Sequence, residues 1–290
     1  MDLNIQNCKI CPRECGANRT KTQGACGADE HMRVAKIMLH RYEEPPISGT
    51  KGSGAIFFCG CSLRCGYCQN AEISRGKIAG EIYSPSRLAA AALQLQSAGA
   101  HNINLITAGH YLPRVKEFLS IAKPKLHIPV VYNSSGYEKA EAVRELNGLV
   151  DIYLPDYKYV SADAAQKYSA AADYPEIAEK AIAEMVAQTG EYKEKDGLAV
   201  KGTVIRHLVL PSLSKDGVLI MQRISALFPA ARVSVMSQYT PSFNRTDYGE
   251  LNRKVTAMEY NRVLRAAQQL NLDGFMQSRD SASDFYTPEF

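Results

Sequence analysis

The sequence has no apolar run near the roughly 18 residues that a helix needs to cross a bilayer. Residues 1–4 are acidic and polar, unlike the start of a secretory signal peptide. The formal net charge is only +4, and the Lys and Arg residues are dispersed, so nothing in the charge pattern favours nucleic acid as a partner. Repeats of solenoid length and low-complexity linkers are also missing. These absences predict a cytoplasmic protein with neither a membrane nor a nucleic-acid partner.

The composition is that of an enzyme with one main domain. Hydrophobic residues make up 46% of the 290 residues, which is ample for a core. Barrels of alternating strands and helices reach this length as single units. The eight cysteines favour metal ligation over disulfides in a reducing compartment, and all but Cys59 fall into two groups.

The sharper group is Cys61, Cys65 and Cys68, in a Cys-x3-Cys-x2-Cys pattern directly after the apolar residues 55–58. So short a loop can wrap three thiolates around one iron–sulfur cubane, whereas disulfides between such near neighbours would be strained. Structural zinc would need a fourth ligand, and Cys59 lies too near Cys61 to complete a relaxed tetrahedron. The spacing therefore predicts a 4Fe–4S cluster with one open iron, where chemistry can occur.

The second group is Cys8, Cys11, Cys15 and Cys26, four thiols within nineteen residues. This is a complete ligand set for either structural zinc or an auxiliary 4Fe–4S cluster, and the spacing alone does not decide between the two. A disordered tail with reactive thiols is the third alternative. The surrounding Gly and Pro residues favour tight turns about a metal.

Beyond residue 50, short apolar runs alternate with helical patterns in about six strand–helix units. β-Branched residues concentrate in the strands, as in a buried parallel sheet. Residues 188–201 are predicted to be a polar surface connection. Strands are expected at 55–58, 102–107, 128–132, 150–154, 203–210 and 232–236, and helices at 86–99, 112–122, 137–146, 162–172, 175–188, 215–227 and 256–270.

With Tyr67 just before the last cysteine, the loop resembles the signature of the radical S-adenosylmethionine (SAM) superfamily. Residues 43–70, 206–211 and 237–241 resemble the uncharacterised relatives of pyruvate formate-lyase activating enzyme. The resemblance implies an α/β fold, with a partial (β/α)6 barrel of the radical SAM type and a C-terminal extension in residues 51–290. A cysteine-rich metal-binding arm is expected in residues 1–50.

Active sites in such barrels lie at the carboxyl ends of the strands. The resemblance implies that Asp156 and Lys158 contact SAM, although a surface ion pair is the alternative for them. Arg206 and His207 alternate in facing along one strand, and the resemblance favours His207 for the cofactor side. Tyr67 is also expected to bind the cofactor.

Other strand ends carry polar side chains. Activating enzymes usually place Gly-Gly-Glu where this chain has residues 107–110, so Thr107 or the neighbouring backbone is expected to hold the amino group of SAM. Asn133 and Ser135 can hydrogen-bond a ribose or a carboxylate, or the serines can cap a helix. His110 faces the substrate or has a structural role. Gln238 and Tyr239 are expected to reach the substrate unless they form a turn.

The resemblance implies reductive cleavage of SAM, with an electron from a low-potential reductant such as flavodoxin or ferredoxin. The resulting 5′-deoxyadenosyl radical would take a hydrogen atom from a substrate. One hypothesis is activation of a glycyl radical enzyme, and another is action on a small molecule or on a different protein. The alternative of another class is a non-catalytic iron–sulfur protein for electron transfer or sensing.

Overall fold

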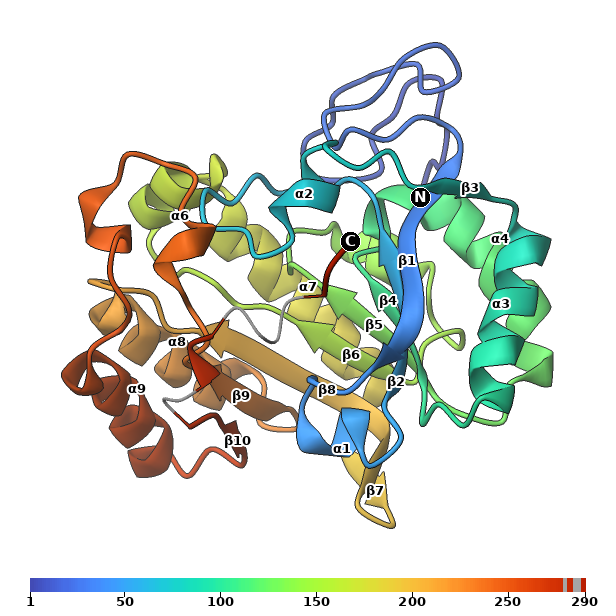
Figure 1. Ribbon diagram of the computed structural model, residues 1–290. Coiled ribbons are helices and arrows are strands. Elements are labelled where there is room, and N and C mark those ends of the chain that lie inside the picture. Colours follow the sequence, from blue (N-terminus) through green and yellow to red (C-terminus); the bar gives the residue numbers. More distant parts are fainter. Residues whose placement is uncertain (279–280, 284–287) are drawn as a thin grey trace.

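A ten-stranded sheet organises the part of the chain that the computed structural model describes, residues 1–278, 281–283 and 288–290 (Figure 1). The strand order is β10-β9-β8-β6-β5-β4-β2-β1-β3, and β7 pairs with β8 outside this path. The chain therefore has an α/β fold with a mostly parallel sheet. The sheet has two edge strands, β10 and β3, so its curvature into a partial barrel stays a prediction.

The parallel part of the sheet carries the strands expected from the apolar runs. Neighbouring strands pair in parallel from β2 through β10, and most of their residues are buried because helices cover the sheet. The strands are β2 (Ser53–Phe58), β4 (Ile103–Ile106), β5 (Val130–Ser134), β6 (Ile152–Pro155), β8 (Leu198–Leu208), β9 (Arg232–Met236) and β10 (Gly274–Met276).

Helices α3 and α4 lie outside one edge of this sheet and α8 and α9 outside the other (Figure 1). Several begin with a proline in the first turn, and the Ser84 hydroxyl caps α3. The longer helices are α3 (Pro85–Ser97), α4 (Leu112–Ala122), α6 (Ala162–Ser169), α7 (Tyr174–Thr189), α8 (Ser214–Leu227) and α9 (Ala257–Gln269). The short ones are α1 (Pro45–Ser48), α2 (Ala71–Ser74), η1 (Gly109–Tyr111), η2 (Lys123–Lys125), η3 (Pro241–Phe243) and η4 (Gly249–Leu251).

The helix expected at 137–146 is much shorter, and α5 spans only Ala140–Arg144. The hydroxyls of Ser134 and Ser135 accept the N–H groups of Gly136 and Tyr137, which holds the chain in turns after β5. The serines therefore shape the end of the strand rather than cap the helix.

Three strands were not expected from the sequence. β1 (Met32–His40) pairs antiparallel with β2 and with β3 (Glu81–Tyr83), so the second half of the predicted arm joins the main sheet. β7 (Lys193–Lys195) forms a hairpin with β8 inside the predicted surface connection. Asp196 and Gly197 both have positive φ at its tip, as the Asp-Gly turn of a tight hairpin requires.

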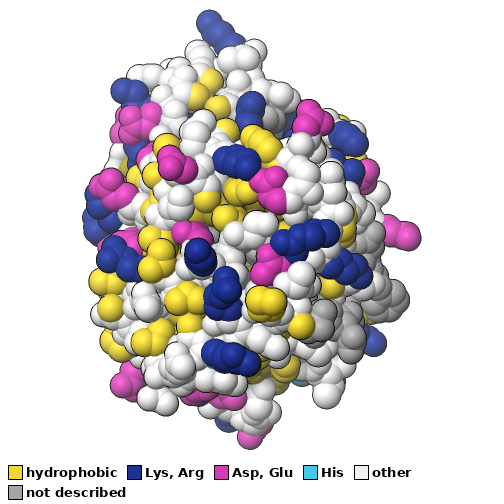
Figure 2. Space-filling view, turned by 90° about the vertical axis from the view of Figure 1, so that its left-hand side faces the viewer, with side chains coloured by type: hydrophobic (Ala, Val, Ile, Leu, Met, Phe, Trp, Pro, Cys, Tyr) yellow, Lys and Arg dark blue, Asp and Glu magenta, His cyan; other side chains and the backbone are white. Residues whose placement is uncertain are grey.

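Residues 1–31 contain no helix or strand and stand as loops above α2 and β1 (Figure 1). On the face that carries α6 and α9, hydrophobic side chains are scattered among Lys, Arg, Asp and Glu without a field of one sign (Figure 2). Among the described residues, no helix is both long enough and apolar enough to span a membrane.

Candidate functional site

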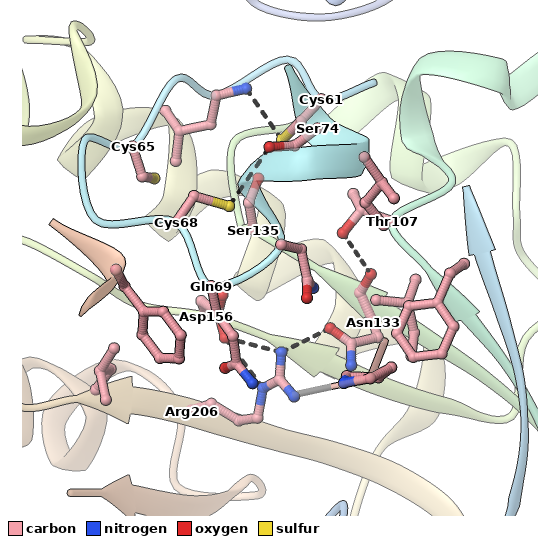
Figure 3. A pocket seen from close by; sticks show the side chains of 18 of the residues that line it. Cys61, Cys65, Cys68, Gln69, Ser74, Thr107, Asn133, Ser135, Asp156 and Arg206 are labelled. Carbon is pink, nitrogen blue, oxygen red and sulfur yellow. Dashed lines mark hydrogen bonds and ion pairs between the residues drawn. The ribbon is translucent and has the colours of Figure 1, made fainter. Parts of the chain in front are cut away.

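The chain leaves β2 at Phe58 and forms a loop that carries Cys61, Cys65 and Cys68 to the carboxyl ends of the parallel strands. All three cysteines line one pocket, together with Ser74 of α2 (Figure 3). The amide of Leu63 donates a hydrogen bond to the Cys61 sulfur at 3.4 Å, and the sulfur of Cys68 lies 3.5 Å from the Ser74 hydroxyl. The sequence-predicted cysteines are thus brought together at a cavity.

Burial raises the pKa of the Cys61 and Cys65 thiols, and the Lys158 ammonium opposes this effect at both. In the described part of the chain, no three His, Cys, Asp or Glu side chains are placed to ligate a single metal ion. A 4Fe–4S cubane requires thiolates that are farther apart, because each thiolate binds a different iron atom of the cluster. Three thiols around one pocket wall fit that requirement.

A buried ionic network forms the opposite wall of the pocket. Arg206 donates to Asp156 at 3.0 Å, to Asn133 at 2.6 Å and to Glu43 at 3.2 Å. Lys158 donates to the other Asp156 oxygen at 2.6 Å. Asp156 and Arg206 meet because a β-bridge pairs their backbones where β6 ends beside β8. The Asp156 and Lys158 pair is therefore part of the cavity and not a surface ion pair.

The network changes the acidity of its members. Burial raises the pKa of Asp156, but Arg206 and Lys158 more than offset this and hold the pKa below its usual value. For Lys158, burial lowers the pKa, and the Asp156 carboxylate outweighs it and raises the pKa. Burial dominates at Glu43 and raises the pKa of its carboxyl despite the nearby Arg206. Asp156 and Lys158 are therefore both charged at neutral pH.

Four more residues predicted to bind the cofactor also line the pocket: Tyr67, Thr107, Asn133 and Ser135. The Tyr67 hydroxyl accepts a hydrogen bond from Tyr159 at 2.5 Å. The Thr107 hydroxyl donates to the Asn133 carbonyl oxygen at 3.3 Å. These residues come from the ends of β2, β4 and β5, and their binding roles remain predictions.

The structure places Arg206 and not His207 on the wall of the pocket, so the predicted contact between His207 and the cofactor gains no support from it. The His207 ring pairs through Nδ1 with the Tyr157 carbonyl oxygen at 2.9 Å. It lies against α8, where a Cβ added to Gly217 would come within 2.9 Å of the ring. Consecutive side chains of β8 do face opposite sides, as predicted, but this alternation does not say whether Arg206 or His207 faces the pocket.

His110 is structural rather than substrate-facing. Its ring is buried, pairs with the Cys59 carbonyl oxygen at 2.8 Å and does not line the pocket. Gln238 lines the pocket, whereas Tyr239 is buried beside it and donates its hydroxyl hydrogen to the Leu251 carbonyl oxygen.

Sequence reasoning gave no role to Glu43 or to Gln69, which also line the pocket. Glu43 reaches the site from the segment between β1 and α1, far along the chain from its partner Arg206. The sequence did contain a signal for Glu43, because this residue begins the stretch 43–70 that resembles known relatives. The burial of Glu43 and its pairing with Arg206 cannot be derived from a single sequence.

The cysteines of the N-terminal loops also lie near one another. Cys8 and Cys26 are buried, Cys11 is partly buried and Cys15 is exposed. A Cβ added to Gly24 would lie 3.5 Å from the sulfurs of both Cys15 and Cys26. The eighth cysteine, Cys59, is a buried free thiol outside both groups and does not line the pocket.

Comparison with known proteins shows the family to which the cysteine loop and the strands around it belong. The model of the Radical SAM superfamily matches residues 55–219. A curated relative from Methanocaldococcus jannaschii, "Uncharacterized protein MJ0674", is 30% identical over 279 residues, which is 93% of this chain and 76% of the relative.

Two solved structures share the fold. A radical SAM methyltransferase from Sphaerobacter thermophilus aligns with a TM-score of 0.54 and 11% identity, over 87% of this chain and 80% of its own. SuiB from Streptococcus suis bound to S-adenosylmethionine aligns with a TM-score of 0.53 and 14% identity, over 78% of this chain and 52% of its own. The chain thus spans about half the length of SuiB.

Proposed function

The chain belongs to the radical SAM superfamily, and from this premise we propose that it cleaves SAM reductively and removes a hydrogen atom from a substrate. The observation that carries the proposal is one pocket lined by three cysteines on one side and by Asp156, Lys158 and Arg206 on the other. When bound, a 4Fe–4S cluster supplies the electron that breaks a carbon–sulfur bond of SAM to give methionine and a 5′-deoxyadenosyl radical.

The residues of the pocket supply binding and placement. Cys61, Cys65 and Cys68 are the proposed cluster ligands. Asp156 and Lys158 are the proposed SAM contacts, because both are charged and both face the cavity. Arg206 orients Asp156, because its Nε donates a hydrogen bond to Asp156 Oδ1 at 3.0 Å and its Nη2 forms an ion pair with the same oxygen at 2.9 Å.

Around this charged wall the pocket is also lined by apolar and amide side chains, including Leu63, Phe243 and Gln69. Such a lining excludes water from a radical that would react with any exposed group. Tyr67, Thr107, Asn133 and Ser135 complete the lining and are the proposed neighbours of the ribose, carboxylate and amino groups of SAM.

The substrate that we propose is a glycyl radical enzyme, which this protein would activate. Support comes from the resemblance of residues 43–70, 206–211 and 237–241 to relatives of pyruvate formate-lyase activating enzyme. A small molecule or another protein is the second candidate, because the wall of Glu43, Asp156 and Arg206 could also bind a polar compound. The proposed reductant is a low-potential donor such as flavodoxin or ferredoxin.

An electron-transfer or sensor protein would need the cysteines but not the rest of the pocket. Burying Glu43, Asp156, Lys158 and Arg206 together is costly unless these groups have a use. The ionic wall opposite the cysteines therefore favours an enzyme over a protein that only carries electrons.

The test is anaerobic reconstitution with iron and sulfide, followed by dithionite and SAM and chromatographic assay of 5′-deoxyadenosine. A variant with Cys61, Cys65 and Cys68 changed to alanine should form none, whereas Cys59→Ala should match the wild type. Absence of product from a wild-type protein with a reducible cluster would contradict SAM cleavage and favour electron transfer.

The substrate is tested separately. The reconstituted protein is mixed with SAM, reductant and a glycyl radical enzyme encoded beside it, and the glycyl radical is measured by electron paramagnetic resonance. A radical that requires the three cysteines supports activation. Formation of 5′-deoxyadenosine without a glycyl radical would direct the search to small molecules.

A further inference from the structure

The N-terminal loops lie directly against the loop that carries the pocket cysteines. The amide of Cys61 donates a hydrogen bond to the carbonyl oxygen of Cys26 at 3.0 Å. Arg13 donates to the carbonyl oxygen of Ser62 at 2.9 Å. Cys26, one of the four N-terminal cysteines, is thus bonded through the backbone to Cys61 of the pocket loop, and any centre held by the N-terminal cysteines would be a neighbour of the pocket.

The N-terminal group of Cys8, Cys11, Cys15 and Cys26 is gathered in one set of loops. A Cβ added to Gly24 would lie 3.5 Å from the sulfurs of both Cys15 and Cys26, and the sulfur of Cys15 lies 3.9 Å from the carbonyl oxygen of Cys8. Four free thiols gathered in this way are a complete ligand set for one metal centre.

Arg19 places a buried positive charge beside the group. It is 2% exposed, donates to the carbonyl oxygens of Asp29 and His110, and lies 3.9 Å from the Cys8 sulfur. No carboxylate in the described chain forms an ion pair with it, and a buried cation without an anionic partner is costly. A metal centre ligated by four thiolates carries the net negative charge that would compensate Arg19.

Two observations favour iron over zinc. The residues 8–15 hold three cysteines with the spacings x2 and x3, which are the spacings of residues 61–68 in reverse order. The N-terminal group also lies directly against the pocket loop through the Cys26–Cys61 hydrogen bond, a position in which an iron–sulfur cluster can exchange electrons with the pocket cluster and a zinc ion cannot.

We propose that Cys8, Cys11, Cys15 and Cys26 ligate a second 4Fe–4S cluster that passes electrons to the pocket cluster. The electron transfer to the pocket cluster, unlike the ligation itself, rests on the proposed function. An external one-electron donor protein is oxidised by one electron, the second cluster is reduced and then reoxidised, and the pocket cluster gains the electron without proton transfer. Cys15 is exposed toward such a donor, and the Cys26–Cys61 hydrogen bond joins the two ligand sets.

The metal content of the full chain tests the site without any activity. Protein purified anaerobically from cells supplied with both iron and zinc should contain about eight irons and eight sulfides per chain. The variant with the four N-terminal cysteines changed to alanine should keep about four, and Cys59→Ala should keep about eight. About four irons with one zinc in the wild type would overturn the proposal, even if the alanine variant failed to fold.

The electron path is tested by changing the donor. With dithionite, which is small enough to reach the pocket, the four-alanine variant should still form 5′-deoxyadenosine. With reduced flavodoxin, it should lose most of this activity relative to wild type and to Cys59→Ala. Equal rates with flavodoxin would overturn the relay, whereas no product from any protein with either donor would instead contradict the proposed function.

Discussion

The hydroxyl of Ser169 lies 3.1 Å from the sulfur of Cys65 and donates a hydrogen bond to it. Ser169 ends α6, more than a hundred residues along the chain from the cysteine loop. A donor at a cluster thiolate stabilises the reduced form, in which the sulfur carries more negative charge. We therefore expect α6 to raise the reduction potential of the proposed cluster through this one side chain.

We expect Ser169→Ala to lower the reduction potential of the pocket cluster, because the thiolate loses its donor. The measurement is a redox titration followed by electron paramagnetic resonance. Ser97→Ala, on the exposed surface at the end of α3, is the control and should leave the potential unchanged. An unaltered potential in a fully loaded Ser169→Ala protein would contradict the assignment.

Gly60 is required where the N-terminal loops meet the pocket loop. Its φ is +88°, and a Cβ there would lie 2.6 Å from the Cys26 carbonyl oxygen. Gly60→Ala should lower the free energy of unfolding by about 1–3 kcal/mol more than Gly76→Ala, which has a similar φ of +77° but open space. Chemical denaturation measures the difference, and equal losses would show that the close contact costs nothing.

Removing the charge of Arg206 should destabilise the protein strongly. Arg206→Met leaves the buried Glu43 without its cation and leaves Asp156 with Lys158 as its only cation, which should cost about 3–5 kcal/mol in the free energy of unfolding. The control Arg223→Met breaks an exposed pair with Glu179 and should cost no more than about 1 kcal/mol. Similar losses in the two variants would mean that the ionic wall is not stabilising.

Asp156→Asn and Lys158→Met should each weaken SAM binding by about tenfold or more, which corresponds to about 1.4 kcal/mol. The reason is that both charged groups face the pocket in hydrogen-bond contact with each other. Equilibrium dialysis of SAM with the reconstituted protein gives the affinity. Lys180→Met removes an exposed cation paired with Glu176 and serves as control; unchanged affinity in the pocket variants would place SAM elsewhere.

Glu259 links stability to pH at the start of α9. Its hydrogen bond with Arg253, together with the amides of Thr256 and Ser212, holds the pKa of its carboxyl below the ordinary 4.5. A lowered pKa in the folded state means that this stabilisation is complete above the unfolded pKa and is lost as the pH falls below it. Glu259→Gln should therefore cost about 1 kcal/mol at pH 7 and much less in acid. A loss independent of pH, measured by denaturation at several pH values, would contradict this.

Much of the fold followed from local pattern. The six expected strands are present because buried parallel strands are short apolar runs, and such runs are visible without knowing their neighbours. β1 was missed because its half-buried residues show no continuous run. β7 was missed because its three residues are all exposed, although Asp196 and Gly197 marked the turn.

The sequence by itself determined the chemistry of the cysteine loop and the identity of the strand ends, because ligand spacing and strand direction are local properties. Only the tertiary structure decided that Arg206 and not His207 faces the pocket, since the choice depends on which face of β8 meets the cavity. It alone brought Glu43 to Arg206 and Cys26 to Cys61. Such contacts join segments far apart in the chain, and packing, not local propensity, selects them.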